Sequence, residues 1–197
     1  MKGKLAVALG ALLCVSVVAG YFVASTDGAP TTDKTVLVYN GPSIANTQAP
    51  PNTPAFTSWC SLDGPCSPSV TMPAIDASTG ELRGQIYVWT KNFVSSADGN
   101  TICFGEFIWF RLSEGSVYVH SGSNGTCGGF MDPAIKAPTH ITGPGQVVGG
   151  GGDGTIVGGT GKYAKWTGTF TDRVFVELSF SGGANYYDQL FWSITRD

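Results

Sequence analysis

The chain has 197 residues, which is enough for one domain with a hydrophobic core and too few for two large ones. Only 13% of the residues are charged, about half of the roughly 25% in an average soluble protein, and 28 are glycine. The low charge and the net charge of −3 argue against a nucleic-acid binder, and the glycine content argues against a helical bundle. Hydrophobic residues make up 42%, so a folded, aromatic-rich all-β domain remains.

The amino terminus has the pattern of an export signal. Lys2 and Lys4 precede an uncharged apolar run over residues 5–24, and small residues at 18–20 and 23–25 offer cleavage sites. We expect a signal helix over residues 1–25. The run is also long enough to be an uncleaved anchor, and only then would the membrane be a partner. Removal of the signal leaves nine basic and fourteen acidic residues, which gives no electrostatic reason to bind nucleic acid.

The cysteines agree with export. Apart from one in the signal, the chain has Cys60, Cys66, Cys103 and Cys127. An even number in an exported chain predicts two disulfides, which can connect in three ways. Because short loops are favoured, we expect Cys60–Cys66 and Cys103–Cys127. A zinc site is the alternative, but these spacings lack the CxxC pairs that zinc favours. We expect a secreted, periplasmic or extracellular protein without a metal.

Residues 26–79 are expected to form an irregular arm. The stretch 26–58 is rich in Thr, Pro, Ala and Asn, which is typical of a linker, and its apolar run at 35–39 predicts at most an edge strand. Residues 59–73 predict a loop held by a disulfide.

Residues 80–197 are expected to be the folded domain. Polar and apolar residues alternate over 81–91, whereas 101–112 is apolar on both faces and predicts a strand covered on both sides. The longest strand candidate is 165–180, residues 186–196 predict the last strand, and 149–152 is a glycine run that indicates a flexible segment. Short strands between glycine turns, without an amphipathic helix, predict a barrel or a sandwich.

The most specific segment is Gly154–Ala164, GTIVGGTGKYA, followed by Gly168-Thr169-Phe170. It resembles the strand, GGTG turn and aromatic residue of the allene oxide cyclase and dirigent barrels. There the GGTG turn joins two adjacent strands of an eight-stranded antiparallel barrel, so the resemblance implies that fold over residues 80–197. A phosphate-binding loop is disfavoured, because a strand pattern rather than a helix follows the glycines.

The resemblance also implies a function. In these families an apolar lumen holds a reactive hydrophobic substrate, and a few polar groups steer its ring closure or coupling without a cofactor. The expected partner is therefore a small hydrophobic molecule, and a homo-oligomer is compatible with the resemblance.

Strand alternation selects two candidate catalytic carboxyls. Asp172 is the one charged residue among the even-numbered positions of 165–180, and Glu106 falls in phase with the even-numbered apolar residues of 101–112. An open lumen would receive both. Two alternatives stay open. A bulge near residue 172 would turn Asp172 to solvent, and Glu106 could face the exterior or pair with Arg111 or Arg83.

Five residues are expected to line a ligand. Four share the faces of the two carboxyls, and the fifth comes from the strand at 116–120; they are Trp166, Phe170, Phe104, Ile108 and Tyr118. Tyr118 shares a face with His120, as an acid–base pair or as partners in a hydrogen bond at the rim.

Two classes of function remain, and whether the protein is an enzyme stays open. One is a cofactor-independent barrel that guides cyclisation or coupling, and the other is an exported binding or structural barrel without chemistry. A weaker third class is a carbohydrate-binding sandwich that uses Trp89, Trp109 and Tyr87. No GxSxG, HxH or HExxH motif supports a serine hydrolase or a catalytic metal.

Overall fold

The computed structural model of the chain describes residues 33–42, 44–62, 64–130, 146–178 and 186–196. The expected signal or anchor at 1–25 lies outside these residues. Within them, no helix is long and apolar enough to cross a membrane. The elements are β1 (Asp33–Pro42), β2 (Ile44–Ala45), α2 (Pro54–Ser61), β3 (Ser67–Asp76), β4 (Leu82–Ser95), β5 (Thr101–Leu112), β6 (Gly115–Phe130), β7 (Gln146–Gly159), the 3₁₀ helix η1 (Gly161–Tyr163), β8 (Gly168–Leu178) and β9 (Tyr186–Arg196).

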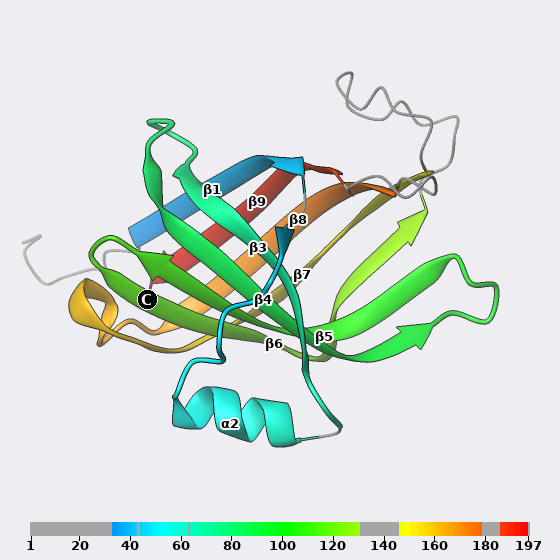
Figure 1. Cartoon of the computed structure of the whole chain (residues 1–197), viewed down its shortest axis with the longest axis horizontal. Helices are drawn as coiled ribbons and strands as arrows, with labels where there is room; N and C mark the ends of the chain where they lie inside the picture. Colours follow the sequence, from blue (N-terminus) through cyan, green and yellow to red (C-terminus); the bar gives the residue numbers. More distant parts are fainter. Residues whose placement is uncertain (1–32, 43, 63, 131–145, 179–185, 197) are drawn as a thin grey trace, which may run out of the picture. The chain divides into compact units, whose positions relative to one another are not determined.

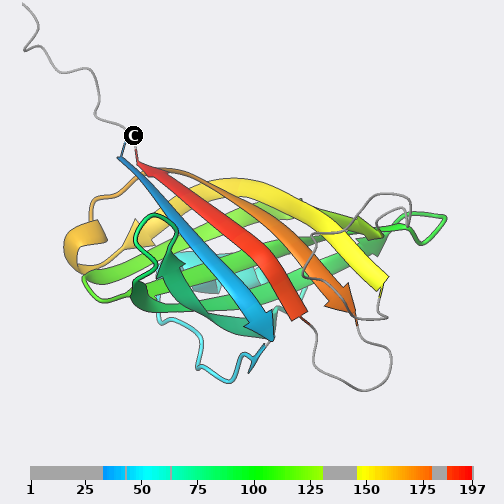
Figure 2. The same ribbon diagram turned by 90° about the horizontal axis from the view of Figure 1, so that it is seen from above.

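The strands form one antiparallel barrel (Figures 1 and 2). Neighbours follow the order β1-β9-β8-β7-β6-β5-β4-β3, and two residue pairs between β1 and β3, Leu37 with Asp76 and Val38 with Ile75, close it. The short strand β2 lies outside this ring, on β3. The expected all-β, eight-stranded antiparallel barrel is confirmed.

The barrel begins earlier in the chain than residue 80. β1 pairs with β9 from Asp33 with Arg196 to Pro42 with Tyr186, and β3 pairs with β4 along most of its length. The expectation that residues 26–79 form an irregular arm is therefore wrong for the described part of that stretch. Prolines at 68 and 73 concealed β3, because proline lacks the N–H that a central strand normally donates.

The GGTG segment joins two adjacent strands, as expected. β7 ends at Gly159, η1 follows, and β8 begins at Gly168 and pairs with β7. Gly161 has φ +57°, and a Cβ there would lie 2.4 Å from the carbonyl oxygen of Glu114. Only glycine fits this turn without strain. The strand expected from residue 165 starts three residues later because Tyr163 and Trp166 turn inward as the chain enters β8.

The glycine run 149–152 belongs to β7 and is not a free segment. Each of these residues has a partner on β6 and another on β8. Pairing with a neighbouring strand on each side holds these glycines in an extended conformation, although glycine itself has little preference for one.

Apolar side chains from all eight strands fill the interior. The inner cluster takes alternate residues of each strand and includes Leu37, Met72, Ile86, Val88, Ile108, Phe110, Val117, Val119, Ile156, Phe170 and Ile194, with Tyr163 and Trp166 beside η1. This period of two is the one that a small closed barrel requires.

A second apolar cluster lies outside the barrel, where α2 covers β4, β5 and β6 (Figure 1). The Thr53 side chain accepts a hydrogen bond from the Phe56 N–H at 3.2 Å, and Pro54 occupies the first turn of α2. The rings of Phe56 and Trp59 face the sheet, and Phe56 lies 5.0 Å from the ring of Phe107. The helix therefore explains why 101–112 is apolar on both faces.

Two disulfides and a lysine hold the covered wall. Cys60–Cys66 joins the end of α2 to the start of β3, and Cys103–Cys127 joins directly opposed residues of β5 and β6. Both expected pairings are confirmed. The Lys91 ammonium donates hydrogen bonds to the carbonyl oxygens of Trp59 and Leu62, where a helix C-terminus favours a cation.

Replacing Phe56 by Ala should lower the free energy of unfolding by about 3–5 kcal/mol, because it empties the centre of the outer cluster. Leu62→Ala is the matched control, since the Leu62 side chain is 56% exposed and should contribute about 0.5 kcal/mol or less. Urea titration followed by tryptophan fluorescence measures both. Equal effects would mean that α2 does not pack on the barrel.

Candidate functional site

Glu106 of β5 and Asp172 of β8 both lie inside the barrel. Their side chains are 9% and 3% exposed, and they fall in phase with Ile108 and Phe170 of the inner cluster. Neither of the two alternative orientations considered for these carboxyls occurs. Asp172 does not turn to solvent, and Arg83 pairs with Asp76 and Glu114 instead of with Glu106.

Irregular pairing of three strands surrounds Glu106, which alternation already directs inward. The β4–β5 ladder shifts register beyond Lys91, and the β5–β6 ladder shifts between Phe104 and Phe107. On β6 the additional residues are 122–125. The backbone N–H of Glu106 therefore donates to the hydroxyl of Ser121, at 2.8 Å. Bulges of this kind reorient a side chain and are common next to functional sites.

A glycine lies between the two carboxyls. Thr126 donates a hydrogen bond from Oγ1 to Oε2 of Glu106, at 2.8 Å. On the next strand Gly152 lies opposite Thr126, and on the strand after that Asp172 lies opposite Gly152. A Cβ on Gly152 would lie 2.5 Å from the Thr126 hydroxyl. The missing side chain thus lets Glu106 with its threonine approach Asp172.

The two buried carboxyls differ in pKa. Burial and the charge of Asp172 together raise the pKa of Glu106 to about 8, against the hydrogen bond from Thr126. Burial also raises the pKa of Asp172 to about 6, against the backbone N–H groups of Gly152 and of Asp172 itself and the charge of Arg173. At neutral pH Glu106 is thus protonated and Asp172 mostly charged, which is the arrangement of a proton donor beside a base.

Asp172 keeps an open hydrogen-bonding position. Its Oδ1 atom is buried and has no hydrogen-bond partner among the described residues. Such an oxygen costs free energy unless a donor reaches it.

The expected lining residues separate into groups. Ile108 and Phe170 lie in the inner cluster beside the carboxyls. Trp166 is also inside, but it packs edge-on against Tyr163, with ring centroids 4.8 Å apart, at the η1 end. Phe104 is only half-buried and stacks on Phe93, so it is not part of the inner cluster.

Tyr118 does not line the lumen, so that expectation is corrected. Its ring belongs to the outer cluster beside Phe107 and Trp109, because even-numbered residues of this part of β6 face outward, whereas Val117 and Val119 face the lumen. His120 lies 3.0 Å, through Nδ1, from the Ser121 carbonyl oxygen, and it lines a cleft of about 310 Å³ beside α2. The hydrogen-bonding partner of this histidine is thus a backbone oxygen and not Tyr118.

Sequence reasoning missed Ser121, Thr126 and Gly152. One signal for Thr126 was present. The expected Cys103–Cys127 disulfide joins neighbouring strands, and the residue before Cys127 then falls beside the residue after Cys103, close to Glu106. No sequence signal distinguishes Gly152 from the glycines around it.

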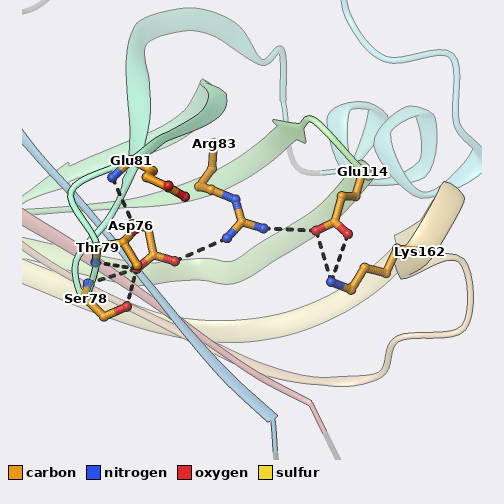
Figure 3. A network of polar contacts seen from close by, with 7 residues as sticks. All are labelled: Asp76, Ser78, Thr79, Glu81, Arg83, Glu114 and Lys162. Atoms are coloured by element: carbon orange, nitrogen blue, oxygen red, sulfur yellow. Dashed lines mark hydrogen bonds and ion pairs between the residues drawn. The ribbon is translucent and has the colours of Figure 1, made fainter.

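A second polar region lies at the η1 end of the barrel (Figure 3). Arg83 of β4 binds Asp76 at 3.3 Å and Glu114 at 3.0 Å, and Glu114 also binds Lys162 of η1 at 3.0 Å. Hydrogen bonds from Ser78 and from Lys162 lower the pKa of Asp76 and of Glu114, respectively. A cavity of about 570 Å³ adjoins this network. Positive and negative groups alternate here, so the network connects three turns and favours no ligand of either charge.

The described residues contain no group of three or more His, Cys, Asp or Glu side chains that could hold a metal ion. The four cysteines among them are consumed in the two disulfides.

Comparison of the chain with models of protein families, with curated proteins and with solved structures finds no match.

The carboxyl pair makes stability depend on pH. The pKa of each group is higher in the folded chain than its ordinary value of 4.5 or 3.8, so the folded state holds protons that the unfolded state releases. The pair therefore stabilises the fold most below about pH 4, and this contribution is lost as pH rises through about 6 and 8. Glu106→Gln should flatten the upper part of this decline and raise the free energy of unfolding at pH 8.5 by about 1–3 kcal/mol. Urea titrations from pH 4 to 9 test this, and an unchanged pH profile would contradict it.

Gly152→Ala should cost about 2–4 kcal/mol, because its Cβ would meet the Thr126 hydroxyl at 2.5 Å and the Gly125 carbonyl oxygen at 2.6 Å. Gly122→Ala is the control, since a Cβ there has nothing within 4 Å. Thermal unfolding of both variants measures the difference, and a stable Gly152→Ala protein would mean that the carboxyls do not depend on this gap.

Proposed function

We propose that the protein is an exported barrel that binds a small hydrophobic molecule in its lumen and steers its cyclisation or coupling without a cofactor. The observation that carries the proposal is the pair of inner carboxyls, Glu106 and Asp172, which are buried inside the barrel on separate strands, where burial raises the pKa of both. Buried titratable groups with shifted pKa values are typical of functional sites.

The size of the inner side chains supports a ligand beside the pair. At the η1 end the inner positions carry Phe110, Tyr163 and Trp166. On β4, β6 and β7 the buried positions near the carboxyls carry small residues, namely Thr90, Ser121, Thr126 and Gly152. An eight-stranded barrel is just wide enough to be filled by side chains or to hold one small ligand. Small residues at one level favour the second outcome there.

The pair can guide a reactive substrate in two ways. Glu106 Oε2 accepts from Thr126, so Oε1 is the oxygen that carries the proton and can donate it to an oxygen that becomes negative during ring closure. The Asp172 carboxylate stabilises positive charge that develops elsewhere in the substrate. The apolar side chains of Ile108 and Phe170 restrict the conformation of the substrate, which favours one product.

Export rests on the amino-terminal pattern and on the two disulfides. Disulfides persist in oxidising compartments, which favours a secreted or periplasmic protein.

A barrel that binds or supports without catalysis is the second candidate. The aromatic packing at the η1 end favours it, because side chains fill that part of the lumen. A carbohydrate-binding surface is disfavoured, since Trp89 is 1% exposed beneath α2 and cannot belong to an exposed aromatic row.

The test uses a hydrophobic substrate that cyclises or couples spontaneously to a racemic product. We expect the protein to give an excess of one enantiomer, measured by chiral chromatography, and the double variant Glu106→Gln/Asp172→Asn to give a racemate. Asp153→Asn is the matched control, because Asp153 is an exposed carboxylate on the neighbouring strand. Binding without any enantiomeric excess would favour the non-catalytic barrel, and no binding would favour a structural role.

A further inference from the structure

We infer that the molecule bound at the Glu106–Asp172 pair carries a basic nitrogen, so that the lumen selects hydrophobic amines over neutral and acidic molecules of the same shape. This inference rests on the proposed lumen site and names the chemical class of its ligand.

Among the described residues, no cation forms an ion pair with either carboxyl. The charge of Arg173 lowers the pKa of Asp172, but its Nη1 donates to the backbone oxygens of Gly152 and Asp172, and its Nη2 lies 3.9 Å from the exposed Asp153. Lys91 extends outward to the end of α2. The lumen side of the sheet thus holds negative charge whenever one carboxyl ionises, and a buried charge needs a counter-charge.

The hydrogen bonds of the two carboxyls also favour a ligand that carries a positive charge. Thr126 supplies one donor to Glu106, and Asp172 Oδ1 is left without a partner although the residue is 97% buried. An ammonium group is a compact donor of up to three hydrogen bonds and carries the charge that the pair lacks. A hydroxyl would satisfy the oxygen but leave its charge uncompensated, and a carboxylate would be repelled.

The apolar side chains next to the carboxyls determine the chemistry of the rest of the ligand. Ile108 and Phe170 flank the carboxyls on their own strands, and both are buried in the inner cluster. An apolar molecule bearing one amine therefore matches the site, whereas a molecule with several polar groups does not.

The test compares matched probes at pH 7 by fluorescence titration: naphthylmethylamine, naphthylmethanol and naphthoate, with the corresponding phenyl compounds as smaller members. The amine should bind at least tenfold more tightly than the alcohol, and the naphthoate at least tenfold more weakly than the alcohol. Asp172→Asn should remove most of the preference for the amine, whereas Asp153→Asn should keep it.

The number of protons released when the ligand binds provides a second test. It would not change if the two carboxyls had only a structural role. A bound ammonium favours the charged form of both carboxyls, so calorimetry in buffers of different ionisation enthalpy should detect proton release on binding of the amine and none for the alcohol. This measurement uses the unaltered protein, so it stands even where a variant fails to fold.

The outcomes separate the two proposals. Equal binding of amine and alcohol, or amine binding without proton release, would overturn the amine inference and leave the hydrophobic site in place. Failure of all six probes to bind would overturn the lumen site and the inference together.

Discussion

An eight-stranded barrel has an interior only as wide as the side chains that point into it, so each inner position decides what the lumen can hold. In this chain the decisive position is Gly152, which has no side chain between Thr126 and Asp172. A methyl group there would collide with the threonine hydroxyl that binds Glu106. The absence of one side chain thus allows two carboxyls on separate strands to share a buried environment, and their shifted acidity follows from that burial.

Sequence reasoning recovered the fold class, the GGTG connection, both disulfides and the inward phase of Glu106 and Asp172. These depend on local signals: alternation along a strand, a glycine turn, and cysteines that are close in the chain. It missed β3 and α2, and it predicted β1 only as an edge strand over residues 35–39 within an irregular arm. β1 belongs to the barrel because it pairs with β9 and β3, and the prolines of β3 give that segment little strand preference of its own.

The same distinction applies within the site. Alternation placed Phe104 and Tyr118 in the lumen, but alternation holds only while the ladder is regular. The register shifts beyond Phe104, so Phe104 is half-buried against Phe93 instead of inside. For Tyr118 the phase was available, since Val117 and Val119 are the inner residues of β6, but only the packing of α2 shows that an outward aromatic is buried.

The irregular wall that carries Glu106 needs support from outside. Bulges interrupt the ladders of β4, β5 and β6 at this level, and interrupted ladders lose hydrogen bonds that would hold the strands in register. Three features compensate on the outer face. Phe107, the next residue after Glu106, is completely buried under the rings of α2, and Lys91, opposite Gly105, ties β4 to the end of that helix. The Cys103–Cys127 disulfide restores the β5–β6 register just beyond the bulge. The apolar outer face of residues 101–112 therefore supports the polar inner site, because the helix that covers one face stabilises the irregular strands whose other face carries Glu106.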